Sequence, residues 1–183
     1  MALLDRDDSV LVVVDAQPRF LGAGSEAALE RIAWLVAVAT RLGVPVIVTE
    51  EEPDRNGATD PRIAERLPAD APVFTKPTFG LAGTPAILEA VRSTGRSTAV
   101  LVGAETDVCV AQSAIGLRES GFACVVVDDA TFSPGEMHER GLARIAAGGV
   151  ARNHAKGVTY EWLRTVDDAH AAFADLPAPP FRL

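Results

Sequence analysis

The segment Thr98-Ala99-Val100-Leu101-Val102-Gly103-Ala104-Glu105-Thr106-Asp107-Val108-Cys109-Val110 decides how the rest of the chain is interpreted. Its apolar first part, residues 98–102, predicts a strand buried in a parallel sheet. Residues 107–120 follow with a helical pattern, and Gly121 is typical of the residue that ends a helix. The segment therefore predicts a strand that leads through a short turn into a helix.

Cys109 occupies the first turn of that expected helix, for which Thr106 or Asp107 would serve as the N-cap. A helix N-terminus offers free backbone N–H groups and a partial positive charge, and both stabilise a thiolate. We therefore expect Cys109 to be a nucleophile with a lowered pKa, beside N–H groups that bind an oxyanion. The alternative is a small buried apolar residue, which is how we interpret Cys124 inside a later predicted strand.

The alternation of strand and helix continues on both sides of this segment. Short apolar runs predict six strands, at residues 9–14, 44–49, 72–75, 98–102, 122–127 and 150–153. Other patterns predict helices at residues 26–42, 60–67, 84–94, 107–120 and 135–147, and short helical segments at 160–165 and 166–174. Because strands alternate with helices across short loops, we expect an α/β fold. It would form one domain over residues 1–183, with three α/β/α layers around a mainly parallel six-stranded, Rossmann-like sheet.

Three side chains of different chemistry lie where predicted strands end. Asp15 follows the first strand, Lys76 the third, and Cys109 comes shortly after the fourth. Taken alone, Asp15 would be a turn cap and Lys76 a surface lysine. Because parallel sheets bind ligands beyond the carboxyl ends of their strands, an acid, an amine and a thiol together indicate a nucleophile with a base and an electrostatic partner.

Composition argues against several classes of function. The net charge is -8 and no cluster of Lys or Arg occurs, which argues against nucleic acid and anionic membrane surfaces as partners. The apolar residues come in short blocks, so no segment approaches a membrane span. The charged start, residues 1–8, lacks a signal-peptide pattern, and two cysteines do not make a disulfide framework, so we expect a cytoplasmic protein.

Three short motifs carry the expected chemistry. They are Asp15-Ala16-Gln17-Pro18-Arg19-Phe20, Lys76-Pro77-Thr78-Phe79 and Gly103-Ala104-Glu105-Thr106-Asp107-Val108-Cys109-Val110. In this order they resemble the Asp-x-Gln-x-x-Phe, lysine and Gly-x-x-Thr-x-x-Cys-Val motifs of the isochorismatase-like cysteine hydrolases, and the last is the most specific. The resemblance covers essentially the whole chain, because Gly121-Phe122, a strand and Asp128-Asp129-Ala130 follow as they do in that family.

This resemblance implies a catalytic triad of Asp15, Lys76 and Cys109. The aspartate would take the thiol proton and the lysine would stabilise the charges. The thiolate would attack a carbonyl-type carbon and form a covalent intermediate that water hydrolyses. The resemblance also implies an oxyanion hole built from the backbone N–H groups of Glu105 and Cys109, and a cis peptide bond between Ala104 and Glu105.

The resemblance further implies a substrate pocket bordered by Gln17, Phe20 and Phe79. Arg19 lies beside it and would either meet a substrate carboxylate or form a surface salt bridge. The region Thr49-Glu50-Glu51-Glu52-Pro53 lacks the Asp-x-His metal site of nicotinamidases in the family, so we expect no metal and no cofactor. Its three carboxylates are more typical of a solvated surface than of a cation site.

We therefore expect a hydrolase that cleaves a C–N bond in a small-molecule amide or ureide. Two alternatives stay open: a vinyl ether hydrolase of the isochorismatase type, and a non-enzymatic binding or scaffold protein that keeps the fold. The resemblance also implies a homo-oligomer, a dimer or tetramer. Tyr160, Trp162, Leu163 and Phe173 would supply an interface or else pack on their own sheet, and the Pro-rich tail, residues 176–183, would be mobile or lie across a neighbouring subunit.

Overall fold

Six parallel strands form the centre of the molecule. The computed structural model describes residues 2–181 and places the strands in the order β3-β2-β1-β4-β5-β6, with every neighbouring pair parallel. The strands are β1 (Ser9–Val14), β2 (Val46–Glu51), β3 (Val73–Lys76), β4 (Thr98–Ala104), β5 (Ala123–Phe132) and β6 (Ala151–Asn153). The predicted α/β fold with a six-stranded sheet is confirmed, and every strand pair in it is parallel.

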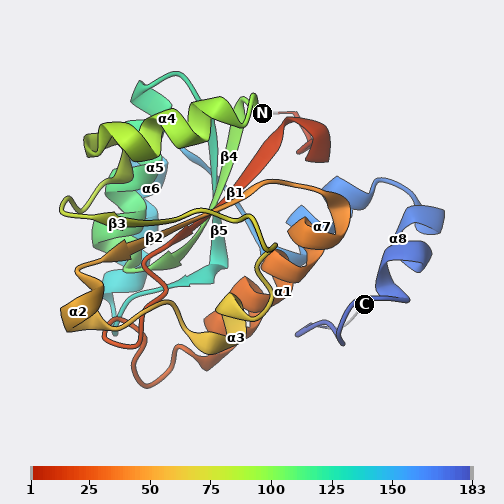
Figure 1. Ribbon diagram of the computed structural model, residues 1–183, viewed down its shortest axis with the longest axis horizontal. Helices are drawn as coiled ribbons and strands as arrows, with labels where there is room; N and C mark the ends of the chain where they lie inside the picture. The colour runs from red at the N-terminus through yellow and green to blue at the C-terminus, as the bar shows by residue number, and fades with distance from the viewer. Residues whose placement is uncertain (1, 182–183) are drawn as a thin grey trace.

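In the described part of the chain, eight α-helices connect or follow these strands (Figure 1). They are α1 (Glu26–Leu42), α2 (Pro53–Asn56), α3 (Pro61–Ala64), α4 (Pro85–Ser93), α5 (Ala111–Glu119), α6 (Met137–Ala147), α7 (Ala155–Leu163) and α8 (Val166–Phe173). Short 3-10 turns cover Arg6–Asp8 and Leu81–Gly83, and a π-helical turn covers Thr106–Val110. Helix α1 has the predicted bounds, and Gly43 ends it with a φ of 70°.

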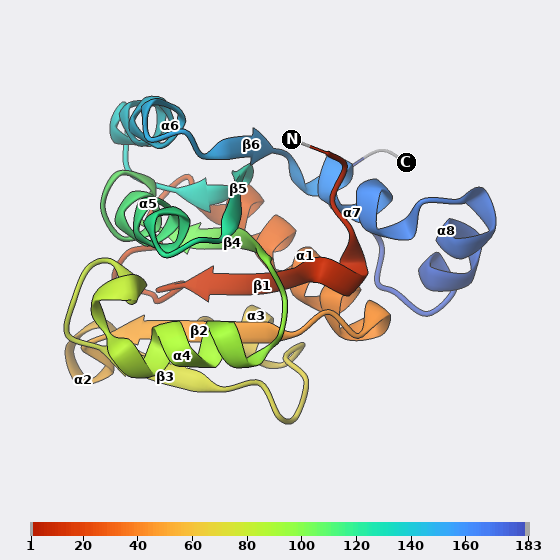
Figure 2. The same ribbon diagram turned by 90° about the horizontal axis from the view of Figure 1, so that it is seen from above.

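The helices cover both faces of the sheet because side chains along each strand alternate between the faces. From β1, Leu11 and Val13 point into a core shared with α1, α3 and α7. Val10, Val12 and Val14 point into a second core shared with α4, α5 and α6. Figure 2 shows these helices on the two sides of the sheet, with α8 beyond the end opposite to the strand arrowheads.

Strands β2 and β5 both continue beyond their predicted carboxyl ends, into residues that carry charge. Strand β2 continues through Glu50 and Glu51, which pair in register with Thr75 and Lys76 of β3. Strand β5 continues past Asp128 to Phe132 across a change of register with β4. The sequence patterns ended both strands before the first charged residue. In the structure Glu50 and Glu51 pair with β3, and β5 resumes pairing with β4 at Thr131 and Phe132.

The carboxyl-terminal residues pack on their own chain. Helix α7 begins at Ala155, five residues before the predicted segment, because the His154 side chain caps it by accepting a hydrogen bond from the Gly157 N–H. Trp162 is buried and donates to the Ser9 hydroxyl, and Phe181 lies edge-on to Trp34 with ring centroids 5.8 Å apart. The described part of the tail therefore packs on its own chain, an arrangement that neither expected alternative described, and Trp162 packs within its own subunit.

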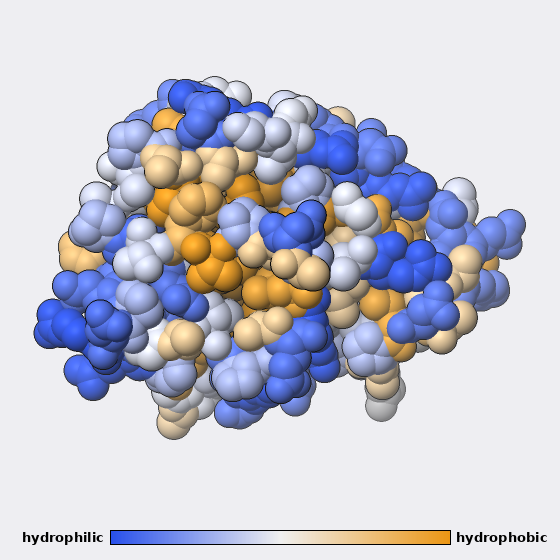
Figure 3. Space-filling view, in the orientation of Figure 1, coloured by the Kyte–Doolittle hydropathy of each residue, from blue (hydrophilic) through white to orange (hydrophobic). Residues whose placement is uncertain are grey.

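One face carries an apolar surface at the edge of the sheet. Figure 3 shows apolar side chains gathered between α4 and α3, framed by hydrophilic residues. A hollow of about 330 Å³ there is lined in part by Pro45, Ile47, Pro72 and Ala90, and Val73 on the edge strand is 51% exposed. Within residues 2–181, no helix is both long enough and apolar enough to cross a membrane.

Candidate active site

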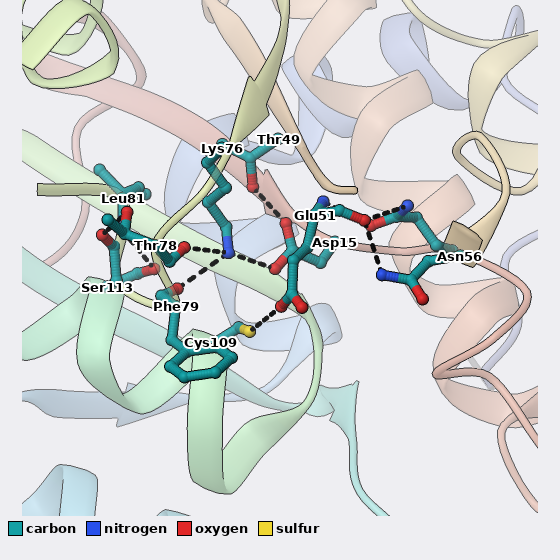
Figure 4. A network of polar contacts seen from close by, with 12 residues as sticks. Asp15, Thr49, Glu51, Asn56, Lys76, Thr78, Phe79, Leu81, Cys109 and Ser113 are labelled. Carbon is teal, nitrogen blue, oxygen red and sulfur yellow. Dashed lines mark hydrogen bonds and ion pairs between the residues drawn. The ribbon is translucent and has the colours of Figure 1, made fainter. Parts of the chain in front are cut away.

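The carboxyl ends of strands β1, β3 and β4 bring the three predicted residues together (Figure 4). Strands β1 and β4 are neighbours, and from them the strand order runs outward in opposite directions. Asp15 follows β1, Lys76 ends β3, and Cys109 lies in the turn after β4. Such a reversal in strand order is where open α/β sheets bind ligands, so the topology places this cluster at the expected position.

Asp15 and Lys76 form a fully buried ion pair, with Lys76 Nζ 2.6 Å from Asp15 Oδ2 and both side chains 0% exposed. The Thr49 hydroxyl donates to Asp15 Oδ1 over 2.8 Å. Lys76 Nζ also donates to the carbonyl oxygens of Thr78 and Phe79, both at 2.9 Å. Because these contacts hold the ammonium group inside the protein, the interpretation of Lys76 as a surface lysine is wrong.

Cys109 is 3% exposed, and its thiol donates to Glu51 Oε2 over 3.4 Å. Burial raises the pKa of this thiol, and the negative charge of Asp15 raises it further, whereas Lys76 lowers it. The expected lowering of the Cys109 pKa is therefore wrong, because desolvation and nearby carboxylates outweigh the helix terminus. Burial also raises the pKa of Asp15 against the opposing effect of Lys76, which makes this carboxylate a stronger proton acceptor.

The turn that carries Cys109 differs from the predicted helix start. Residues 106–110 form a π-helical turn after Glu105, whose side chain does not cap it. Thr106 instead shares a hydrogen bond of 2.9 Å with His138 Nδ1, and Asp107 accepts one from the Ser133 hydroxyl. Both predicted N-cap residues therefore attach the turn to the segment at the end of β5 and the start of α6.

Two glycines allow the backbone to approach closely around this turn. Gly103 has a φ of 125°, and a Cβ there would collide with the Val14 carbonyl group of β1. A Cβ at Gly141 would lie 2.6 Å from the Asp107 backbone nitrogen, so α6 packs directly on the Cys109 turn. The peptide bond between Ala104 and Glu105 is cis, as the resemblance implies.

The predicted oxyanion-hole residues lie on this same turn. The Glu105 carbonyl accepts hydrogen bonds from the N–H groups of Val108, at 3.2 Å, and Val110, at 3.0 Å. Burial and the charges of Asp107 and Glu51 raise the pKa of the Glu105 carboxyl group, so the entrance to the site is rich in negative charge.

Gln17 is fully buried, and backbone groups occupy its side chain. Its Oε1 accepts from the Glu51 N–H over 2.7 Å, and its Nε2 donates to the carbonyls of Glu51, at 3.0 Å, and Gly57, at 2.5 Å. Gln17 therefore positions the end of β2. The Phe79 ring is 54% exposed and Phe20 is half-buried, so both have surface that a ligand can contact, and Arg19 is exposed.

Sequence patterns missed Glu51. The three consecutive carboxylates were expected on a solvated surface, and the structure separates them. Glu50 is buried and accepts from the N–H and hydroxyl of Thr59, Glu51 reaches Cys109, and Glu52 forms an exposed ion pair with Arg55. The surface interpretation holds for Glu52 alone. The sequence did indicate a role for Glu51 in the site, because it lies near the carboxyl end of a strand beside the strand that Asp15 follows.

The side chains of Asp15, Glu51 and Cys109 have oxygen and sulfur atoms within 4.8 Å of one another, a spacing that a metal ion can bridge. The Lys76 ammonium group already lies 2.6 Å from Asp15 and supplies a positive charge there. Because a second cation would be repelled by that charge, the donor set fits proton transfer better than metal binding.

Comparisons with known proteins agree with this geometry. The model of the isochorismatase domain matches residues 9–156. Isochorismatase domain-containing protein 2 of Xenopus laevis is 30% identical over 155 residues, which are 80% of this chain and 73% of the relative.

Solved structures are similar as well. One is the YcaC gene product of Escherichia coli, an octameric hydrolase of unknown specificity, with a TM-score of 0.88 and 25% identity over 95% of this chain and 88% of its own. Another is YcaC of Pseudomonas aeruginosa with hexane-2,5-diol and covalent acrylamide, with a TM-score of 0.84 and 26% identity over 93% and 87% of the two chains.

Proposed function

The chain belongs to the isochorismatase family of hydrolases, and we propose that it cleaves a C–N bond of a small amide or ureide through Cys109, Asp15 and Lys76. The observation that carries this proposal is a buried Asp–Lys ion pair beside a buried thiol at the carboxyl ends of the strands. Burying two charged groups beside a thiol costs desolvation free energy. A purely structural role does not account for that cost, and a role in the reaction does.

The first half of the reaction forms a bond to sulfur. The Cys109 thiol proton moves to the Asp15 carboxylate as Sγ attacks the carbonyl carbon. The carbonyl oxygen becomes an oxyanion that accepts hydrogen bonds from the N–H groups of Glu105 and Cys109. When the C–N bond breaks, the leaving nitrogen takes the proton from Asp15, and an acyl group remains on Sγ. Lys76 keeps Asp15 ionised before the attack and orients it throughout, because the Lys76 ammonium group is fixed by two backbone carbonyls.

The raised pKa of Cys109 fits this order of events. A thiol that keeps its proton at rest must lose it in the same step in which it attacks, so its reactivity depends on the adjacent base. Asp15, whose pKa is raised by burial, is such a base. Water then hydrolyses the acyl group and regenerates the thiol.

The test is alkylation of Cys109 by acrylamide, the electrophile bound covalently in the Pseudomonas neighbour, across a pH series with mass spectrometry to locate the adduct. We expect labelling at Cys109 before Cys124, and slower labelling in Asp15→Asn. A screen of amides, ureides and a vinyl ether then identifies the bond cleaved. Labelling that is indifferent to Asp15, together with no turnover of any substrate, would favour the scaffold alternative.

We also propose that the chain forms a homo-oligomer, a dimer or tetramer, in the cytoplasm. An octameric structural neighbour and the apolar surface around Val73 on edge strand β3 support assembly. Two free cysteines support a reducing compartment. Light scattering coupled to gel filtration measures the assembly, and a monomer at micromolar concentration would contradict it.

A further inference from the structure

Glu51 is the second carboxylate at the thiol, and nothing above assigns it a role in the reaction. Its backbone is fixed on both sides, because the N–H donates to Gln17 and the carbonyl accepts from Gln17 and Asn56. Its carboxylate therefore has a fixed origin, and Oε2 lies 3.4 Å from Cys109 Sγ. An acyl carbon bonded to that sulfur lies at most one bond further away, close enough for a single water to bridge it to this carboxylate.

Asp15 and Glu51 differ in their access to water. Asp15 is 0% exposed, and its two oxygens are taken by Thr49 and Lys76. A water molecule that approached Asp15 would have to displace one of these partners. Glu51 is half-buried, and the Cys109 thiol is the one hydrogen-bond partner of its carboxylate within residues 2–181.

Acylation removes the thiol proton that both carboxylates face. Asp15 still keeps Thr49 and Lys76, whereas the Glu51 carboxylate loses its hydrogen-bond donor. An ionised carboxylate that faces partly accessible space without a donor binds water. The water bound there would lie beside the acyl carbon, within the range from which a general base acts.

We propose that Glu51 is the general base that hydrolyses the acyl-enzyme, an inference that rests on the proposed function of Cys109. Glu51 takes a proton from the water as its oxygen bonds to the acyl carbon. The C–S bond then breaks, the carboxylic acid leaves, and the sulfur takes the proton from Glu51. Asp15 serves formation of the acyl-enzyme and Glu51 serves its hydrolysis, so each carboxylate returns its proton within its own half of the cycle.

The resting geometry agrees with this division. The last step leaves a protonated thiol donating to an ionised Glu51, and this is the hydrogen bond that the structure contains. The cycle therefore ends in the observed arrangement without any further proton transfer.

The experiment separates the two halves with p-nitrophenyl acetate, whose nitrophenolate leaves without a proton. In Glu51→Gln we expect a burst of one nitrophenolate per subunit, an acetyl group on Cys109 by mass spectrometry, and steady-state turnover lower by about 10²-fold. Hydroxylamine, a stronger nucleophile than water, should release the acetyl group from this variant as a hydroxamate. Glu52→Gln is the matched control, since this adjacent carboxylate is exposed and pairs with Arg55, and it should turn over as the unmodified protein does.

Each outcome bears on one claim. Unchanged turnover in Glu51→Gln overturns the role of Glu51 and leaves the proposed function intact. Loss of the burst in Glu51→Gln would mean that Glu51 takes the thiol proton, which also overturns this division of roles. A protein with unaltered sequence that shows neither burst nor acetylated Cys109 contradicts the proposed function itself. Iodoacetamide labelling of Cys109 and the melting temperature, measured on each variant, confirm that the fold is retained.

Discussion

The surroundings of Cys109 and Cys124 make the most informative comparison in this molecule. Both thiols are free and nearly inaccessible, at 3% and 4% exposure, and burial raises the pKa of both, that of Cys124 to about 12. Cys124 lies within β5, where its sulfur faces the Phe122 carbonyl oxygen at 3.8 Å. Cys109 instead lies beside two carboxylates and an ammonium group.

The comparison teaches that burial and pKa alone do not distinguish a nucleophile from a core residue. What differs is a proton acceptor within reach of the sulfur, and that acceptor depends on the ion pair with Lys76. The chemistry assigned to Cys109 is therefore a property of its neighbours on β1, β2 and β3 rather than of its helix terminus.

The largest expected effect comes from replacing the two sulfurs in turn. Cys109→Ser should lower turnover of any substrate by more than about 10³-fold, because a hydroxyl is a far weaker nucleophile beside the same base. Cys124→Ser should change turnover less than about 2-fold, since its sulfur touches no group of the site and distant changes are nearly independent. Steady-state assays on both variants measure this, and a comparable loss in both would end the distinction between the two thiols.

Replacing Lys76 tests whether its ion pair with Asp15 holds a buried charge beside Cys109, the feature that Cys124 lacks. Lys76→Met leaves the Asp15 carboxylate buried without its cation, and we expect a loss of about 3–5 kcal/mol in the free energy of unfolding. Arg152→Met, which breaks the partly exposed ion pair with Asp128, should cost at most about 1 kcal/mol. Urea denaturation of both variants gives the two values. Equal losses would show that Lys76 does not hold a buried charge in place.

The fold was more predictable than the site, and particular residues show why. The strand that contains Val10 to Val14 and the helix that ends at Gly43 were predictable from short stretches of sequence, because each depends on the pattern of residues that are close together in the chain. The triad positions were found through motifs and through the rule that strand ends carry chemistry. The direction of the Cys109 pKa shift could not be predicted in this way, because it depends on how the whole fold buries the thiol.

Glu51 shows the limit of local patterns most clearly. A run of three glutamates has the composition of a surface loop, and only pairing with β3 extends the strand to place one of them inward. Its partner Cys109 is 58 positions away in the chain. Likewise, the π-helical turn depends on contacts of Thr106 and Asp107 with His138 and Ser133, which no spacing within the motif encodes.

A smaller effect is expected at Thr49, which holds Asp15, the proposed proton acceptor for Cys109. Thr49→Val keeps the shape of the side chain but removes the hydroxyl that donates to Asp15. The pKa of Asp15, already raised by burial, should rise further, because the ionised form loses a hydrogen bond. Since a protonated Asp15 cannot accept the thiol proton, the acidic limb of Cys109 labelling should move to higher pH and neutral labelling should fall about 10-fold.

The pH profile of acrylamide labelling measures this shift. Thr75→Val, at an exposed position of β3, is the matched control and should leave the profile in place. Labelling of Cys124 in the same samples should not respond to either change. A profile that stays fixed in Thr49→Val would mean that Asp15 is not the group that controls Cys109.

The smallest expected effect is one that the two thiols share. A folded-state pKa above the ordinary value of 9.0 means that the unfolded chain releases the thiol proton first as pH rises. Stability from each buried neutral thiol is therefore fully present below pH 9.0 and falls above it. Between pH 9 and pH 10 the loss is about 1 kcal/mol for each thiol.

Urea denaturation at these two pH values, applied to Cys109→Ala and Cys124→Ala, isolates the two contributions, because other alkaline groups are common to all variants. Each substitution should reduce the alkaline loss of stability by the same amount, about 1 kcal/mol, although their effects on turnover differ by orders of magnitude. An alkaline loss confined to one cysteine would show that the folded-state pKa of the other is not raised. Equal losses would show that both thiols keep their protons in the folded protein up to pH 10, so that their difference in turnover comes from the groups beside each sulfur.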